Sequence, residues 1–236
     1  MKKLLLFCLA LTAACAVSAQ NYYTDALQSL RNAKAQGALV MHNHPGWRRK
    51  SLEHPEFEVK AYGEGLIDGI EIMNGAEFYP KAIARAHARK LFVSANTDIH
   101  DATAETYRLQ GHRRNMTLIF ARDNSLASLR EALEARRTLA YSFGTIAGDE
   151  QLLKDLFTAS VRTKVLHTDP NNGRRTVSLT NNSSVEYVLR FPEQNPVVLK
   201  PFSTMTTSVS SDKPLRLTVE NMWYSEKEHP HIEIRL

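Results

Sequence analysis

The feature that most constrains this chain is a change of hydrophobic pattern near residue 160. Before that point, continuous apolar runs alternate with segments whose apolar residues recur at helical spacing. After it, only short runs of alternating side chains remain, separated by turn-rich stretches such as 169–173. The first pattern is typical of parallel β/α units buried on both faces, and the second of antiparallel sheets. The sequence therefore predicts an α/β domain over 20–159, followed by a small antiparallel β-sandwich over 160–236.

Individual elements follow from the same periodicities. In the first domain, the expected strands are 38–42, 69–73, 91–95, 116–121 and 138–142. A first helix is expected to begin after Thr24 and to end at Gly37, and further helices are expected over 56–62, 79–90, 125–137 and 148–157. In the second, the expected strands are 161–166, 176–180, 185–190, 204–209, 215–219 and 232–236.

The first 19 residues have the composition of a secretory signal peptide. Lys2 and Lys3 precede an apolar run that ends in small residues at Ala19. The run is too short to span a bilayer, so no stable membrane anchor is expected. An alternative is a lipoprotein anchored through Cys15, although the usual leucine three positions earlier is missing. The sequence thus predicts export to the periplasm.

Cysteine and charge restrict the chemistry further. Cys8 and Cys15 both lie in the signal peptide, so the mature chain has no disulfide and no thiolate ligand. A bound divalent metal would need imidazole and carboxylate ligands, which suit zinc, manganese or iron. Removing Lys2 and Lys3 lowers the formal charge from +5 to +3. This mild excess is compatible with a small anionic substrate and gives no reason to expect nucleic acid.

Two histidine motifs follow apolar strand-like runs. His42 and His44 end the first run, and Asp98 and His100 follow the run at 91–95. Because residues i and i+2 of an extended chain point the same way, each motif can direct two metal-binding groups to one point. Both motifs lie at the carboxyl ends of predicted parallel strands, where β/α folds place their chemistry. The pair therefore predicts a metal site.

Several segments resemble proteins of the PHP (polymerase and histidinol phosphatase) family, in particular its secreted phosphodiesterase branch. These are the His-Pro-Gly segment at 37–47, a strand with the helix after it at 69–82, the Asp-x-His motif at 96–100, and a later strand at 114–121. The motifs occur in the family's order, and the resemblance covers about residues 24 to 160.

The resemblance implies a distorted (β/α)7 barrel, present here only in part, that holds divalent metals and hydrolyses phosphate esters. It makes His44, Asp98 and His100 the metal ligands. His42, Glu71 and Asn74 are expected beside them as accessory groups. Arg48 and Arg114 are expected to contact the substrate phosphate through charge-assisted hydrogen bonds.

The chain also departs from the family pattern. The family's earlier His-x-His and Thr-x-His strand ends do not occur before His44. The predicted strands are too few to close the barrel, which should leave the edge before 38–42 open to a companion chain or a second copy. Three interpretations follow: half of a split enzyme, a truncated and inactive binding protein, or a reduced domain that dimerises. If active, the protein is a phosphoesterase that uses metal-activated water.

Overall fold

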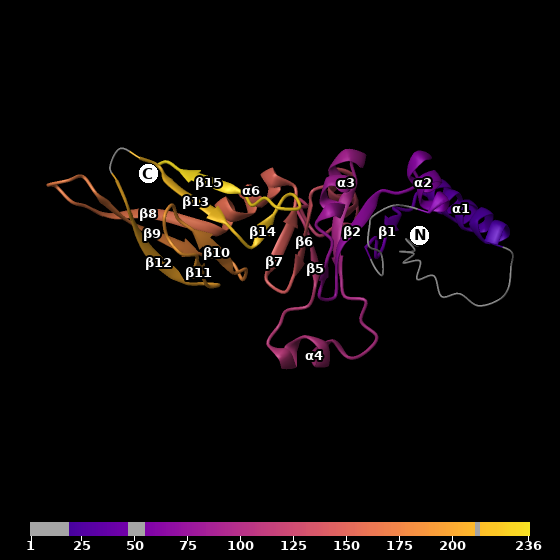
Figure 1. The fold of residues 1–236 in the computed structure, drawn as a ribbon, viewed down its shortest axis with the longest axis horizontal. Coiled ribbons are helices and arrows are strands. Elements are labelled where there is room, and N and C mark those ends of the chain that lie inside the picture. Colours follow the sequence, from indigo (N-terminus) through magenta and orange to yellow (C-terminus); the bar gives the residue numbers. More distant parts are fainter. Residues whose placement is uncertain (1–18, 47–54, 211–212) are drawn as a thin grey trace.

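The structure is a computed structural model that describes residues 19–46, 55–210 and 213–236. Residues 1–18 of the expected signal peptide, and Arg48, lie outside the described residues. Helices and a first sheet occupy one end of the molecule, a second sheet lies in the middle, and two antiparallel sheets form the other end (Figure 1). None of the described helices has the length and apolar character needed to cross a membrane.

The first sheet is built on β2, the fully buried strand Gly69–Asn74. It pairs in parallel with β1 (Met41–His42) and with β4 (Phe92–Asn96), while the short β3 (Glu77–Phe78) folds back on it antiparallel. The sequence predicted this parallel arrangement correctly. Among the described strands, β1 pairs with β2 alone, so β1 is an edge of the sheet, as expected.

Helices accompany this first sheet near the predicted positions. They are α1 (Ala19–Ala35), α2 (Glu56–Gly63) and α3 (Lys81–Arg89). One apolar cluster joins α1 to α2 through Leu27, Leu30 and Ala61, and it includes Leu66, which follows α2. Helix α3 packs on β2 through Ala82, Ile83 and Ala86, all nearly inaccessible to solvent. This follows from the helical spacing of those residues.

The second sheet corrects a prediction. Its strands β5 (Met116–Ile119), β6 (Thr138–Ser142) and β7 (Thr145–Gly148) pair antiparallel, whereas the sequence predicted parallel units at 116–121 and 138–142. A two-residue turn at Phe143 and Gly144, whose φ angles of 46° and 82° suit a tight hairpin, sets the antiparallel direction of β6 and β7. This turn also makes a strand of 145–148, which the sequence analysis missed.

Threonine side chains connect the two sheets. The Val93 N–H donates to Thr138 Oγ1 at 3.0 Å, and the Ala95 N–H donates to Thr117 Oγ1 at 3.1 Å. Hydroxyl groups thus satisfy amides of β4 that a neighbouring strand would otherwise bind. Consequently, the described strands form separate sheets and no closed barrel.

The remaining helices are short. Helix α5 (Leu126–Glu134) begins at Ser125, whose hydroxyl caps the Ser128 N–H, and α6 (Glu150–Ser160) begins at Asp149, which caps Leu152. A projecting segment after β4, absent from the sequence-based expectation, carries α4 (Thr103–Thr106) and the 3₁₀ turn η1 (Arg108–Gln110) (Figure 1).

The C-terminal part is the antiparallel sandwich that the alternating pattern predicts. One sheet has the order β12-β9-β8 and the other β11-β10-β13-β15. The strands are β8 (Val161–Thr168), β9 (Arg175–Asn181), β10 (Tyr187–Arg190), β11 (Val197–Leu199), β12 (Thr204–Val209), β13 (Leu215–Val219) and β15 (His231–Ile234). Side chains from both sheets share one apolar core, which includes Val177, Leu179, Leu189 and Leu217.

A strand from beyond residue 160 completes the second sheet. β14 (Met222–Trp223) pairs in parallel with β7, and Trp223 packs edge-on against Phe78 with ring centroids 5.9 Å apart. Next to β14, Asn221 donates to the carbonyls of Gly144 and Glu186, both at 2.8 Å, and accepts the Val188 N–H at 2.9 Å. Asn221 therefore fastens the β6–β7 turn to the sandwich.

Candidate metal and phosphate site

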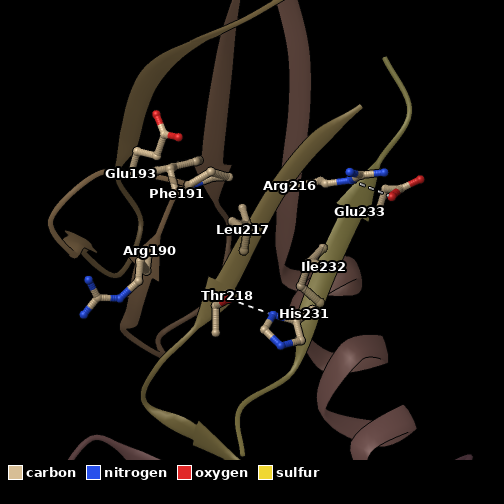
Figure 2. Close-up of a pocket in the computed structure, with 10 residues that line it drawn as sticks. Arg190, Phe191, Glu193, Arg216, Leu217, Thr218, His231, Ile232 and Glu233 are labelled. Carbon is tan, nitrogen blue, oxygen red and sulfur yellow. Dashed lines mark hydrogen bonds and ion pairs between the residues drawn. The ribbon is translucent and has the colours of Figure 1, made fainter. Parts of the chain in front are cut away.

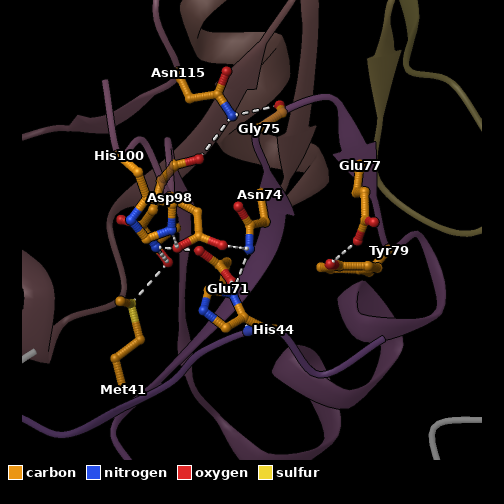
Figure 3. Close-up of polar contacts among 12 residues, drawn as sticks. Met41, His44, Glu71, Asn74, Gly75, Glu77, Tyr79, Asp98, His100 and Asn115 are labelled. Carbon is orange, nitrogen blue, oxygen red and sulfur yellow. Dashed lines mark hydrogen bonds and ion pairs between the residues drawn. The ribbon is translucent and has the colours of Figure 1, made fainter. Parts of the chain in front are cut away.

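Three parallel strands direct polar side chains to one edge of the first sheet. His44 follows β1, Asn74 ends β2, and Asp98 follows β4. Parallel pairing places the carboxyl ends of these strands together, and the three side chains form one polar cluster with the buried Glu71 (Figure 3). We call Glu71 and these three residues the strand-end cluster.

Glu71 fixes the orientation of His44. Its carboxylate is inaccessible to solvent, and its Oε2 accepts the His44 backbone N–H at 2.6 Å and lies 2.7 Å from His44 Nδ1. The other oxygen, Oε1, accepts the Asn96 amide at 2.7 Å. Asn74 Nδ2 also contacts His44 Nδ1. Because the carboxylate is the stronger acceptor, we assign the Nδ1 proton to the bond with Glu71, which leaves the lone pair on Nε2 and makes the Asn74 contact one between two N–H groups, not a hydrogen bond.

Asp98 and His100 continue the cluster towards solvent. Asp98 Oδ2 lies 3.5 Å from the Asn74 amide nitrogen, and Asp98 Oδ1 lies 3.7 Å from His100 Nε2. The His100 side chain is 87% exposed, compared with 33% for His44. The three predicted ligands are thus neighbours along a line of contacts that passes through Asn74.

The side-chain types in this cluster are ones that bind divalent metals. Imidazole, carboxylate and amide groups are ligands for zinc, manganese and iron. An imidazole that donates its second ring N–H to a buried carboxylate is the usual support of a metal-binding histidine, and the His44–Glu71 pair has this form. Among the described residues, no three His, Cys, Asp or Glu side chains converge closely enough to hold a metal ion. The ligand set His44, Asp98 and His100 stays a prediction.

The expected convergence of His42 and His44 was wrong. His44 has a φ of 51°, so the chain leaves the extended conformation directly after β1, and the two imidazoles face different groups. His42 Nδ1 lies 2.7 Å from the Tyr62 hydroxyl, and His42 Nε2 lies 3.5 Å from Glu58 Oε1. His42 therefore belongs to a separate polar group facing α2. Asp98, with a φ of 47°, likewise departs from the extended geometry assumed for Asp98 and His100.

The His42 group yields a prediction on stability at high pH. Burial raises the pKa of Tyr62 to about 12. Because this pKa lies above that of an unfolded tyrosine, the neutral phenol stabilises the fold fully below about pH 10, by at most about 3 kcal/mol. We expect this contribution to be lost as the pH rises from about 10 through 12. Urea unfolding at pH 8 and pH 11 should therefore show a larger loss for wild type than for Tyr62→Phe. Equal losses would contradict the prediction.

The arginines predicted to bind phosphate are less well placed. Arg48 lies outside the described residues. Arg114 is exposed. Burial raises the pKa of the Tyr107 hydroxyl, and the positive charge of Arg114 opposes part of this rise. Arg114 directly precedes Asn115, a buried residue that donates to the carbonyls of Gly75 at 2.7 Å and Asn96 at 2.8 Å. Arg114 therefore lies beside the segment that supports the strand-end cluster.

Sequence reasoning missed the supports of this cluster. Asn115 also accepts the Ser142 hydroxyl at 3.0 Å, which ties the loop after β2 to the second sheet. Tyr79 packs on Gly46, where an added Cβ would lie 2.4 Å from the ring, and its hydroxyl donates to Glu77. Burial, followed by the Glu77 carboxylate, raises the pKa of Tyr79. Among these supports, Asn96 is the one that the sequence could have indicated, because it directly follows the apolar run 91–95. Its amide donates to Glu71.

Comparisons with known proteins give one informative match. No family model matches the chain, and no curated protein matches it. A crystal structure from Bacteroides vulgatus, of a two-domain protein containing a predicted PHP-like metal-dependent phosphoesterase, is similar with a TM-score of 0.81 and 28% sequence identity. The similarity covers 88% of this chain and 65% of that one, so the chain spans just under two thirds of its length. The fold is therefore a mixed α/β fold like that of a two-domain PHP-like protein, and the similarity supports the PHP superfamily.

Proposed function

We propose that this protein is an exported, PHP-type metal-dependent phosphoesterase that hydrolyses small anionic phosphate esters. The observation that carries the proposal is the His44–Glu71 pair, a supported imidazole at the carboxyl ends of parallel strands. The similarity to a predicted PHP-like phosphoesterase supports the same reaction class. The proposed export rests on the sequence of residues 1–19.

In this proposal, His44, Asp98 and His100 hold zinc, manganese or iron. When bound, the cation would lower the pKa of a water molecule and polarise the phosphoryl group. Glu71 keeps the Nδ1 proton on His44 and so presents Nε2 as the ligand. Asn74 donates to Asp98 at 3.5 Å, and the exposed His100 lies 3.7 Å from Asp98. Arg114, and Arg48 with it, would balance the charge of the substrate phosphate.

The test measures metal binding and hydrolysis by the full chain. After chelation, zinc, manganese or iron is restored, and the hydrolysis of p-nitrophenyl phosphate and of bis-p-nitrophenyl phosphate is followed. We expect metal-dependent hydrolysis that falls at least tenfold in His100→Ala, because loss of even a group that only supports a metal ligand costs 10 to 100-fold. His167→Ala, an equally exposed histidine in β8, is the matched control and should retain wild-type activity. Equal activity in wild type and His100→Ala, or none in either with metal supplied, would overturn the proposal.

A second candidate is favoured by the incomplete convergence of ligands in the described residues. In this alternative, the chain is one half of a split enzyme or an inactive binding protein, and a companion chain or a second copy pairs with the open edge of β1. Activity that appears only in a complex, measured together with mass by light scattering, would favour the split enzyme. Metal-dependent activity of the monomer would exclude it.

A further inference from the structure

The sandwich has an opening where two of its strands part. β10 pairs with β13 only at Leu189–Val219 and Arg190–Thr218. The chain then turns away through Phe191 and Pro192, and proline cannot donate to a strand ladder. A hollow of about 400 Å³ lies at this point (Figure 2).

We call this first hollow the mixed hollow, because its lining holds both hydrogen-bond donors and carboxylate acceptors. Thr218 and His231 supply donors, with His231 Nδ1 lying 2.8 Å from the Thr218 hydroxyl, and Arg190, whose Nε is paired with Glu220, can offer its terminal nitrogens. Glu193 and Glu233 supply carboxylate acceptors. A neutral group that both donates and accepts, such as a sugar hydroxyl, suits such a wall, whereas a lone anion would be repelled by the two carboxylates.

A second hollow of about 340 Å³ adjoins the first and shares Arg216 and Glu233 with it. We call it the cationic hollow, because it is also lined by Arg175, Lys213 and Arg235. Lys213 and Arg235 are exposed, and neither forms an ion pair with any other described residue. Within the described residues, the lining of this hollow thus holds two cations with no ion-pair partner, beside the Glu233 carboxylate that Arg216 neutralises.

The ion pair between the hollows is weakly held. Arg216 Nε lies 2.9 Å from Glu233 Oε2, and the two side chains are 66% and 45% exposed. Exposed pairs of this kind contribute little to stability. Because the bond to Glu233 uses only Nε, the terminal nitrogens of Arg216 can meet a ligand while the Glu233 charge stays neutralised. Arg216 can thus serve a ligand that spans both hollows.

We propose that these two hollows bind an acidic oligosaccharide. A sugar carboxylate lies in the cationic hollow against Lys213, Arg235 and Arg216, where charge-assisted hydrogen bonds hold it. Neutral hydroxyls of the neighbouring sugar lie in the mixed hollow against Thr218 and His231. The site is on the sandwich, on a different sheet from the strand-end cluster (Figure 1).

Calorimetric titration of the full chain with trigalacturonate tests this proposal. We expect binding that weakens as salt is raised, because salt screens exposed charges. Lys213→Ala combined with Arg235→Ala should weaken binding at least tenfold. Lys164→Ala combined with Arg162→Ala makes the same changes at exposed positions of β8, in the other sheet, and should leave the affinity unchanged.

Further titrations separate the sources of affinity. Maltotriose has no carboxylate and should bind at least tenfold more weakly, while inorganic phosphate fills only the cationic hollow and should also bind more weakly. A trisulfated sugar that binds as tightly as trigalacturonate would retain the site but overturn the assignment of the charge to a carboxylate. Maltotriose or phosphate binding as tightly, or full affinity in the Lys213 and Arg235 variant, would overturn the proposal. Circular dichroism of each variant identifies any that fails to fold, and the single Arg235→Gln exchange then replaces it.

Discussion

Replacing His44 by alanine is expected to reduce metal-dependent phosphodiester hydrolysis by about 100-fold or more. Removing even a group that only supports a metal ligand typically costs 10 to 100-fold, and His44 is proposed as a ligand itself. The change also leaves Glu71 buried without the imidazole that it contacts at 2.7 Å. Initial rates with saturating metal, together with metal affinity from calorimetry, measure the effect.

The control for His44 is His87→Ala. His87 is an exposed residue of α3 that contributes nothing to the strand-end cluster, so hydrolysis and metal affinity should stay at wild-type values. A His44→Ala protein that folds, binds metal normally and loses only activity would show that His44 contacts the substrate instead. Full activity and full metal affinity in this variant would contradict the proposed role altogether.

Replacing Asn221 by alanine is expected to lower the free energy of unfolding by about 2–3 kcal/mol, because three side-chain hydrogen bonds are lost at roughly 1 kcal/mol each. Two of these bonds join the β6–β7 turn to the sandwich through the Gly144 and Glu186 carbonyls. Urea unfolding monitored by tryptophan fluorescence and by circular dichroism measures the loss.

Asn195→Ala is the matched control for Asn221. Asn195 is exposed in the turn between β10 and β11, so its replacement should change the free energy of unfolding by less than about 0.5 kcal/mol. A loss in Asn221→Ala no larger than in Asn195→Ala would show that the Asn221 bonds do not hold the two parts together.

The sequence predicted the parts of the fold that depend on local pattern. The buried strand Gly69–Asn74 and the helix after Pro80 follow from continuous and periodic apolar residues. It predicted the wrong direction for β5 and β6, and it missed the β6–β7 hairpin, since that turn depends on two positive φ values, one of them at Phe143, a residue that rarely adopts them. Strand β14 was also missed, because two residues carry no periodicity.

The sequence predicted which strand ends carry the candidate site, but it did not predict how all of the side chains there are oriented. His44, Asp98, Asn74 and Glu71 do meet at the strand ends, because parallel pairing brings those ends together. His42 does not join them, because the argument from extended geometry fails once His44 takes a positive φ. Asn115 contributes through its amide from a distant strand, and no spacing in the sequence reports such a contact.

The position of β14 has a consequence for how the protein is made. The sheet that contains β5, β6 and β7 receives its last strand from Met222–Trp223, more than 70 residues after β7 ends at Gly148. A chain emerging from the ribosome or through a translocation channel can form its N-terminal elements early, as domains generally do. It cannot complete this sheet until the more than 70 residues between β7 and β14 have also appeared. Until then, the outer edge of β7 is exposed to other chains, and a chaperone that covers it would act in the interval between the synthesis of β7 and that of β14.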